Sequence, residues 1–482
     1  MPRSAKTSKN ISVTSNINMF KKLRSLILVS LVVALLGQGC TNAPSAAVKN
    51  ATKPVTLEWW TVYDDANAIQ PVINAYRAIH PNVSVNLRIM RLNEYEDALI
   101  NALAEDRGPD ILSLHNTWIP KYQNKLAPIP DAITVPFTTV QGTIKKESVT
   151  ELRTKPGLSV KDLKSQFVDQ VGSDVIVNAP SDSQPPVNKD RIFALPLAGD
   201  ALALYYNKDL LNAAGVPEPP VYWDDFQKMI PKLTKQDTKG NIIQSGAALG
   251  TGKNVERFSD ILSVLMMQNG TAMTNGDQVT FDKTPAELSG RDTAPADSAV
   301  TFYTDFANPA KEVYTWNDKL PDSLQAFASG QTAFFFGYSY QLPQIVSQAP
   351  KLNLGIAKLP QIRDNPEVNF ANYWVEGVSK KSVNQNWAWD FLEFAAGADQ
   401  ASKYLTAANR PTALRSLIQQ QTEDINLSVF ASEMLTAKSW YRGKSDANCE
   451  QAISDLIYSV LDGNETRRSV QNAANRVNET YQ

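Results

Sequence analysis

The sequence predicts an α/β protein of two lobes, each a mainly parallel sheet flanked by helices. The chain has 482 residues, which is too long for one ordinary hydrophobic core. From Val55 to Leu114 it shows strand and helix patterns in the order strand, helix, strand, helix, strand. Because parallel neighbouring strands need crossover helices between them, this order predicts a parallel sheet with right-handed connections.

The first 40 residues have the layout of a secretory signal. Three basic residues between positions 21 and 24 precede the apolar run from Leu26 to Leu36, which is too short to cross a bilayer as a stable helix. The run ends at Gly37-Gln38-Gly39-Cys40, which resembles a bacterial lipobox, although that motif usually has leucine where Gly37 stands. The resemblance implies a lipid on Cys40 that anchors the protein to the cell membrane, facing the extracytoplasmic side. Either Met1 or Met19 starts the leader.

Composition and charge exclude several classes of function. The 47 basic and 49 acidic side chains leave a net charge of -2, so the sequence lacks the basic footprint of a nucleic-acid-binding protein. Two cysteines, Cys40 and Cys449, and two histidines are too few for a structural zinc site. A lipid on Cys40 would leave Cys449 without a disulfide partner. We expect no metal and no cofactor.

The first predicted sheet carries aromatic loops at one edge. Its strands are 55–61, 83–90 and 110–114. Asp64 and Asp65 cap the first helix, and Asn93 caps the second. Loops 59–63 and 115–118 follow the first and third strands. Since ligands of parallel sheets bind at the carboxyl ends of the strands, we expect both loops to face a ligand.

One carboxylate lies in apolar surroundings after the next strand pattern. The run from Ile192 bends at Pro196 and Gly199, Asp200 follows, and residues 201–206 alternate as a strand. Asn207 is a capping-type residue that begins a helix, and Gly215 ends it. Further patterns predict helices at 160–171, 258–268, 298–306, 320–329 and 387–395, and a strand at 242–249.

These motifs, in this order, resemble the sugar-binding proteins of bacterial ABC importers, extracellular solute-binding proteins similar to maltose-binding protein. The matching stretches are Gly108-Pro109-Asp110 with its strand, Tyr206-Asn-Lys-Asp-Leu210, Gly337-Tyr338 after a buried strand, Asn369 to Val378, and Arg410 to Ala413. The resemblance covers roughly residues 55–130 and 190–480. It implies a periplasmic-binding-protein-like fold with the ligand cleft between the lobes and an ABC permease as partner.

The resemblance also implies a division of the chain. Residues 1–40 are the signal peptide, and the small, polar residues 41–54 suit a flexible tether. We expect lobe 1 at 55–196 plus 361–409, with an insertion at about 131–190, and lobe 2 at 197–360 plus 410–482. The chain would cross between the lobes near 196–199, 357–362 and 405–412.

A sugar offers hydroxyls that need polar partners and flat C–H faces that stack on aromatic rings. The loops that we place at the cleft supply both kinds of group. The predicted aromatic planes are Trp60, Tyr63, Trp118, Tyr338, Trp374 and Trp440, and the predicted polar partners are Asp64, Asn116, Asp200, Glu376 and Arg410. The resemblance assigns hydroxyl binding to Asp200 and stacking to Tyr338. Alternation predicts that Trp59 is core when Trp60 faces the cleft, and that Tyr205 and Tyr206 belong to the sheet.

We therefore predict a lipid-anchored, extracytoplasmic substrate-binding protein of an ABC importer. It would be a monomer without enzymatic activity that captures a mono- or oligosaccharide and delivers it to a membrane permease. A non-sugar solute such as a polyamine or a peptide remains an alternative ligand. A lipid-anchored carbohydrate-active enzyme that uses Asp200 and Glu376 is a further alternative, although the sequence has no Gly-x-Ser-x-Gly nucleophile motif.

Overall fold

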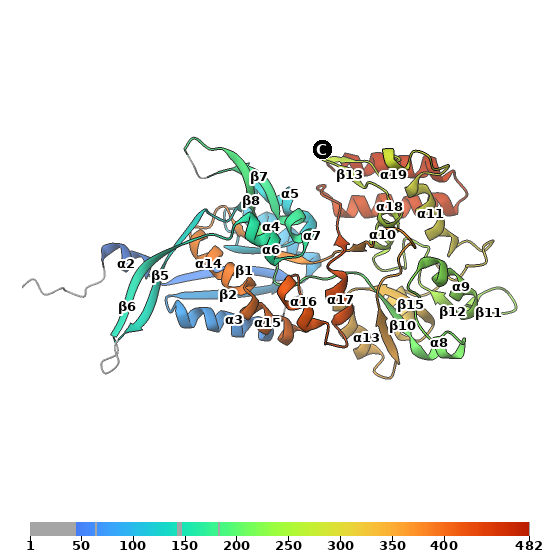
Figure 1. Ribbon diagram of the computed structural model, residues 1–482, viewed down its shortest axis with the longest axis horizontal. Coiled ribbons are helices and arrows are strands. Elements are labelled where there is room, and N and C mark those ends of the chain that lie inside the picture. Colours follow the sequence, from blue (N-terminus) through green and yellow to red (C-terminus); the bar gives the residue numbers. More distant parts are fainter. Residues whose placement is uncertain (1–44, 63–64, 142–146, 182–183, 482) are drawn as a thin grey trace, which may run out of the picture.

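The computed structural model describes residues 45–62, 65–141, 147–181 and 184–481. These residues form two lobes arranged along the long axis of the molecule (Figure 1). The predicted signal peptide with its lipobox and Cys40 lies outside the described residues, and so do Tyr63 and Asp64. Within the described ranges, no helix combines the length and the apolar character needed to cross a membrane.

Part of the predicted tether is helical. Helix α2 (Ala46–Ala51) begins after Ser45, whose hydroxyl accepts a hydrogen bond from the Val48 N–H at 3.2 Å. The helix packs on a long hairpin of lobe 1, and Val48 is buried there. The prediction of a flexible tether is therefore wrong for residues 46–51, because this short helix has an apolar surface to pack on.

The sheet of lobe 1 has the strand order β2-β1-β3-β18-β4, and β9 also pairs with β18. The strands are β1 Val55–Val62, β2 Val83–Met90, β3 Ile111–His115, β4 Leu126–Ala127, β9 Ala194–Leu195 and β18 Trp374–Ser379. β1 runs parallel to β2 and β3, as predicted. β18 runs antiparallel to β3, β4 and β9, because it returns to this sheet from lobe 2.

Helices and short turns complete lobe 1. They are α3 Ala66–Ile79, α4 Leu92–Ala104, η1 Asn116–Trp118, α5 Ile119–Tyr122, η2 Gln123–Lys125, α14 Gln385–Ala396, α15 Ala398–Ala408 and α16 Arg415–Gln421. Asp65 caps α3 by accepting the Asn67 N–H at 2.8 Å, as the sequence predicts. Asn93 is not a cap, because α4 already begins at Leu92 and its N-cap is Arg91. Trp59 is fully buried and meets Phe391 edge to face.

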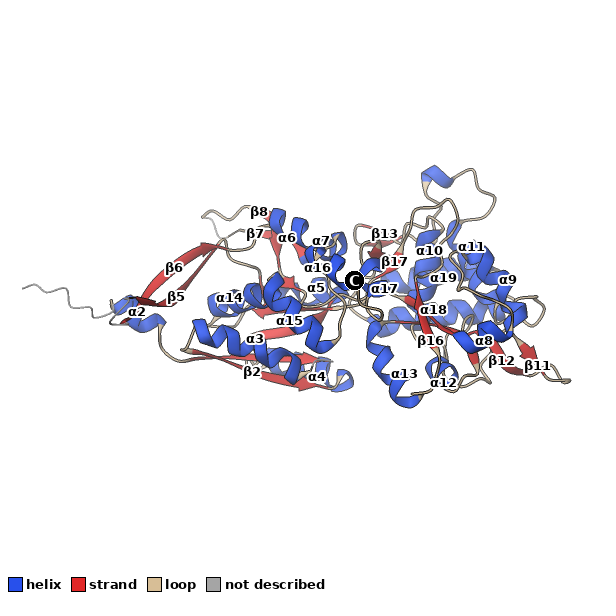
Figure 2. Ribbon diagram, turned by 60° about the horizontal axis from the view of Figure 1, so that its bottom comes forward, coloured by secondary structure: helices blue, strands red, loops and turns tan. Residues whose placement is uncertain are grey.

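The region predicted as an insertion forms two hairpins and two helices. Its elements are β5 Ala132–Gln141, β6 Glu147–Pro156, α6 Val160–Gln166, α7 Asp169–Val175, β7 Ile176–Pro180 and β8 Asn188–Ile192. Figures 1 and 2 show the β5–β6 hairpin reaching away from lobe 2. The single helix predicted at 160–171 is broken between α6 and α7. There the Val168 N–H donates to the carbonyl of Ala413 at 3.0 Å, so a distant contact replaces the helical hydrogen bond.

The sheet of lobe 2 has five strands in the order β11-β12-β15-β10-β16. The strands are β10 Ala203–Asn207, β11 Lys235–Gln236, β12 Ile242–Ala247, β15 Thr332–Gly337 and β16 Leu354–Ala357. Only the β12–β15 pair is parallel among these strands, so the prediction of a mainly parallel sheet is wrong for lobe 2. β10 enters from lobe 1 and runs against both of its neighbours.

Three helices of lobe 2 overlap the helices predicted at 258–268, 298–306 and 320–329. Helices and turns are α8 Lys208–Ala213, α9 Trp223–Leu233, α10 Phe258–Gln268, η3 Ala286–Leu288, α11 Pro295–Asp305, α12 Ser323–Ala328, η4 Ser339–Gln341, α13 Leu342–Gln348, α17 Ser428–Glu433, α18 Asp446–Leu461 and α19 Thr466–Glu479. A small hairpin joins β13 Thr274–Asn275 to β14 Gln278–Val279. Asn207 caps α8 through the N–H groups of Asp209 and Leu210, at 3.0 and 3.2 Å.

Within the residues that the structure describes, the chain passes between the lobes three times. Residues 196–202 make the first passage, from β9 to β10. The second passage joins β17 (Asn369–Phe370) to β18. It comes later than the predicted 357–362, because Leu359 and Val368 still pack in the core of lobe 2.

The third passage joins α16 to α17 and also comes later than the predicted 405–412. Leu414 and Ile418 still pack in the core of lobe 1, whereas Phe430 of α17 packs with Tyr205 of lobe 2. After α17, β19 (Ala437–Lys438) pairs with β17 at the junction of the lobes.

Hydrogen bonds tie the first passage to the second passage and to the loop between α15 and α16. The Gly199 N–H donates to the carbonyl of Pro411, and the Asn372 N–H donates to the carbonyl of Asp200, each at 3.0 Å. Asp200, Asn372 and the residues next to Pro411 are thereby held together between the two sheets.

Candidate functional site

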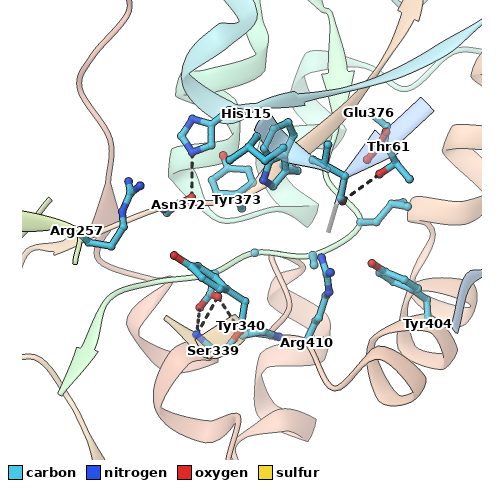
Figure 3. A pocket seen from close by; sticks show the side chains of 18 residues that line it. Thr61, His115, Arg257, Ser339, Tyr340, Asn372, Tyr373, Glu376, Tyr404 and Arg410 are labelled. Atoms are coloured by element: carbon cyan, nitrogen blue, oxygen red, sulfur yellow. Dashed lines mark hydrogen bonds between the residues drawn. The ribbon is translucent and has the colours of Figure 1, made fainter. Parts of the chain in front are cut away.

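A cavity lies between the lobes where the passages meet (Figure 3). Lobe 1 contributes β1, the end of β3 and the start of β18, whereas lobe 2 contributes the start of α10 and turn η4. The first and second passages, the start of α4, α15 and the loop between α15 and α16 supply the remaining wall. The lining residues are Thr61, Val62, Leu92, His115, Leu197, Ala198, Gly199, Asp200, Arg257, Ser339, Tyr340, Asn372, Tyr373, Trp374, Glu376, Tyr404, Arg410 and Pro411.

Asp200 is held in place by the turn that follows β15. Its carboxylate accepts the backbone N–H and the hydroxyl of Ser339, at 3.0 and 2.7 Å, and also the Ala201 N–H at 3.0 Å. Burial raises the pKa of Asp200 from 3.8 to about 7, and the hydrogen bonds and the charge of Arg410 oppose this rise. The group therefore changes its protonation state near neutral pH, at the wall of the cavity.

A second carboxylate, Glu376, lies on the lobe 1 side. It is almost fully buried, and its Oε2 accepts hydrogen bonds from the Trp59 indole N–H at 2.8 Å and from the Ser113 hydroxyl at 2.6 Å. Trp59, Ser113 and Glu376 come from β1, β3 and β18, three adjacent strands. The sheet thus fixes the orientation of this carboxylate.

His115 is a neutral hydrogen-bonding group in the cavity. Burial lowers its pKa, which favours the uncharged ring. Its Nε2 lies 3.0 Å from Oδ1 of Asn372, and its Nδ1 lies 2.7 Å from the Thr117 hydroxyl. Because an amide oxygen only accepts, Nε2 donates to Asn372 and Nδ1 accepts from Thr117.

Aromatic rings line both sides of the cavity. On the lobe 2 side Tyr340 is 49% exposed and stacks on Tyr338, with ring centroids 5.9 Å apart and an interplanar angle of 11°. On the lobe 1 side Trp374 meets Trp118 edge to face, with centroids 5.4 Å apart. Tyr340 therefore offers a flat face to the cavity, and Tyr338 supports that face from behind.

Two arginines bring donors into the cavity. Arg257, at the start of α10, has its guanidinium paired with Asp260 at 2.7 Å. Arg410 points into the cavity (Figure 3), and its side chain makes no hydrogen bond or ion pair with any residue in the described part of the chain. The donors of Arg410 are thus available to water or to a ligand, whereas those of Arg257 are partly engaged.

The structure brings together four of the eleven residues predicted for the site. Asp200, Trp374, Glu376 and Arg410 line the cavity. Tyr63 and Asp64 lie outside the described residues. The other five, Trp60, Asn116, Trp118, Tyr338 and Trp440, do not line it.

Each of these five side chains contacts a residue that does not line the cavity. The ring of Trp60 lies against the Arg88 guanidinium, at 4.6 Å. Tyr338 is fully buried and donates to Asp260 at 2.7 Å, and the Trp440 indole donates to Ser263 at 3.0 Å within lobe 2. Asn116 and Trp118 are buried and make hydrogen bonds toward lobe 2.

A family model also matches the sequence of these two α/β lobes. The model for the bacterial extracellular solute-binding proteins matches residues 60–402. The chain belongs to this family. Within the described residues of this solute-binding protein, no three His, Cys, Asp or Glu side chains lie close enough together to hold a metal ion.

Two curated relatives are similar over different lengths. A binding protein of Brucella abortus is 27% identical over 231 residues, which are 46% of this chain and 50% of that protein. The match therefore spans half of the length of that relative. The galactooligosaccharide-binding protein of Bacillus subtilis is 20% identical over 398 residues, 82% of this chain and 81% of that protein.

A solved structure supports the fold. The ABC transporter solute-binding protein of Thermotoga lettingae, bound with α-D-tagatose, aligns with a TM-score of 0.62 and 18% identity, over 89% of this chain and 100% of that one. At this identity the likeness establishes the two-lobed fold, and the ligand of that protein remains a property of that protein.

The sequence-based prediction missed several lining residues of the solute-binding protein. Tyr340 lies two positions after Tyr338 and could have been chosen from the sequence. Turn η4 determines which of the two rings reaches the cavity. Arg257 gave no pattern signal; in the structure it is the N-cap residue of α10 and has a left-handed φ of 57°. Tyr404 lies on α15, and only the packing of that helix against lobe 1 brings it to the cavity.

Proposed function

We propose that the protein captures a saccharide in the inter-lobe cavity and delivers it to an ABC permease. The observation that carries this proposal is that one cavity is lined by the exposed ring of Tyr340, by Arg410 and by the fixed carboxylate of Asp200. A flat ring suits the C–H face of a sugar, and charged groups that accept or donate suit its hydroxyls. The names of the Bacillus subtilis and Thermotoga lettingae proteins support a sugar as ligand.

The proposed binding event uses both lobes. His115 and Glu376 line the cavity on the lobe 1 side, and Ser339 and Tyr340 line it on the lobe 2 side (Figure 3). A ligand that touches both walls favours the arrangement in which they approach, so binding would be coupled to closure of the lobes. The closed protein would then be the form that the permease recognises.

We further propose that Cys40 carries a lipid that anchors the protein to the outer face of the membrane. The motif at residues 37–40 supports this assignment. Mass spectrometry of the protein from its native host should find a lipid on Cys40. A mature protein that starts at another residue would contradict the assignment.

Thermal denaturation with a panel of ligands tests the sugar assignment. The panel holds galacto-oligosaccharides, maltodextrins and tagatose as saccharides, with spermidine and a short peptide as the other solute classes. A ligand present at 100 times its Kd stabilises the folded protein by about 2.7 kcal/mol, which raises the melting temperature. A shift with a saccharide is expected, whereas a shift only with spermidine or the peptide would contradict the proposal.

A second measurement separates binding from catalysis. The oligosaccharides are incubated with the protein, and newly formed reducing ends are measured over time. No release is expected from a binding protein. Steady release that is lost in the variants Asp200→Asn or Glu376→Gln would identify a hydrolase instead.

A further inference from the structure

Asp174 is a buried carboxylate outside the cavity that receives hydrogen bonds from both lobes. It lies on α7, and its side chain is fully buried. From lobe 1, the Tyr373 hydroxyl donates at 2.5 Å, and the side-chain amides of Asn116 and Gln170 donate at 2.9 and 2.6 Å. Tyr373 also lines the ligand cavity, so the carboxylate supports one wall of the site.

The same carboxylate is bound from the lobe 2 side. The Ser439 hydroxyl donates to it at 3.0 Å, and the Arg442 guanidinium forms an ion pair with it. Arg442 is tied to lobe 2, because its N–H donates to the Tyr481 hydroxyl at 2.9 Å and its guanidinium donates to the carbonyl of Tyr441 at 2.8 Å. The ion pair therefore joins two elements that are anchored in different cores.

Nearby side chains add further bonds between the lobes. The Asn116 amide also donates to the Ser439 hydroxyl at 3.0 Å, and the Trp118 indole N–H donates to the carboxylate of Asp446 at the start of α18. Asn116 and Trp118 belong to turn η1, which directly follows β3 of the lobe 1 sheet. Two residues that the sequence predicts as ligand contacts thus take part in the contact between the lobes.

Helix α7 is firmly fixed in lobe 1. Val171 and Val175 on this helix are fully buried in the lobe 1 core. Figure 1 shows α7 at the end of lobe 1 that faces lobe 2. A buried ion pair tolerates little displacement, because separation leaves both charges without compensation. A rotation of lobe 2 against lobe 1 has to break or rebuild this contact.

We infer that Asp174 is a positioning residue that sets the orientation of the two lobes through Arg442 and so controls access to the ligand cavity. It does not line the cavity itself. It acts through Tyr373 on the lobe 1 wall and through Arg442 on lobe 2. The effect on lobe orientation is independent of the proposed function, whereas its effect on ligand affinity rests on that function.

The inter-lobe distance, measured in the absence of ligand, tests the inference. Spin labels are attached at Arg77→Cys on α3 and at Gln325→Cys on α12, two exposed helical positions in different lobes. The full chain carries Cys40→Ser, and Cys449 is buried and does not react. Double electron–electron resonance then gives the distribution of distances between the lobes.

Arg442→Gln is the decisive variant, because it cuts the ion pair and leaves the bonds of Asp174 within lobe 1. We expect the mean distance to shift by more than about 2 Å, the scale of a domain rearrangement. Arg442→Lys keeps a cation and should remain near the wild-type distribution. Arg476→Gln is the matched control, because Arg476 pairs with Asp455 within lobe 2.

Two results would overturn the inference. One is a wild-type distance distribution in Arg442→Gln. The other is an equal shift in Arg442→Gln and Arg476→Gln, which would indicate a general loss of charge instead of a specific contact. The saccharide that gives the largest thermal shift is then titrated against Arg442→Gln and wild type, and at least a threefold change in Kd is expected. If no saccharide binds the wild type, the proposed function fails while the distance measurement still decides the role of Asp174.

Discussion

Ser339 donates both its backbone N–H and its hydroxyl to the carboxylate of Asp200, at 3.0 and 2.7 Å. Asp200 lies on the first passage between the lobes, and Ser339 begins a turn of lobe 2. The bonds thus attach the passage to lobe 2 at the wall of the cavity. They also hold a carboxylate whose pKa burial raises to about 7.

Asp200→Asn should change the pH dependence of stability. The pKa of Asp200 is higher in the folded protein, about 7, than its ordinary value of 3.8, so ionisation destabilises the fold as the pH rises through this range. The cost is complete above about pH 7, where it reaches up to about 4 kcal/mol, and it is absent below about pH 4. Asparagine never ionises, and its amide can still bond Ser339. Relative to wild type, the variant should therefore gain free energy of unfolding as the pH rises.

Urea denaturation of both proteins between pH 4.5 and 8 checks this prediction. Burial also raises the pKa of Glu433 to about 7, but that group is present in both proteins and cancels in the difference. A difference in unfolding free energy that does not vary with pH would show that Asp200 keeps an ordinary pKa in the fold.

Tyr340→Ala should weaken saccharide binding with little effect on stability. The ring is 49% exposed and stacks on Tyr338, so its removal exposes little core. Loss of one ring face should cost about 1.4 kcal/mol of binding, or about tenfold in Kd. Calorimetric titration with the best saccharide gives the Kd.

Tyr338→Phe is the control, and we expect it to change stability instead of affinity. It removes the hydroxyl that donates to the buried Asp260 and should cost about 1–3 kcal/mol of stability, with affinity near wild type. If Tyr340→Ala and wild type bind the saccharide with equal affinity, Tyr340 does not contribute to the binding site.

Arg410→Gln should reduce affinity while the melting temperature stays near wild type. The Arg410 side chain makes no hydrogen bond or ion pair with another residue of the described ranges, so the folded protein loses little. A hydrogen bond from a charged donor to a ligand contributes about 1.5–3 kcal/mol, which corresponds to about a tenfold to hundredfold change in Kd. Titration of wild type, Arg410→Gln and the surface control Arg476→Gln checks the effect. A similar loss in both variants would argue for a long-range effect of charge.

Local patterns predicted the elements of this fold well. The sequence predicts α10 with the bounds that the structure has, and the cap at Asn207 and the buried Trp59 follow from capping chemistry and strand alternation. The positions of the second and third passages do not follow in this way. They depend on which core receives Val368 or Ile418, and both cores consist of apolar side chains.

In the candidate site, too, local patterns do not predict which side chains reach the cavity. Asn116 and Trp118 follow β3, at the predicted edge of the sheet, but a single turn directs them toward Ser439 and Asp446 of the distant C-terminal segment. Tyr338 and Tyr340 are equivalent in sequence, and turn η4 buries one ring and exposes the other. Such choices depend on tertiary contacts, which a local pattern does not contain.

Gly199→Ala should destabilise the protein, because the first passage packs closely against the loop between α15 and α16. The Gly199 N–H bonds the carbonyl of Pro411, and an added Cβ would lie 2.8 Å from the end of the Met434 side chain and 3.1 Å from the Cβ of Ala413. Overpacking of this kind costs about 1–3 kcal/mol, which urea denaturation can resolve.

The second substitution Ala413→Gly removes one of the clashing atoms, so the double variant should recover part of the loss. Gly290→Ala is the control, because an added Cβ there meets nothing within 4 Å. If Gly199→Ala and Gly290→Ala are equally stable, the first passage has room to move away from the loop between α15 and α16, and the close contact at Gly199 does not restrain it.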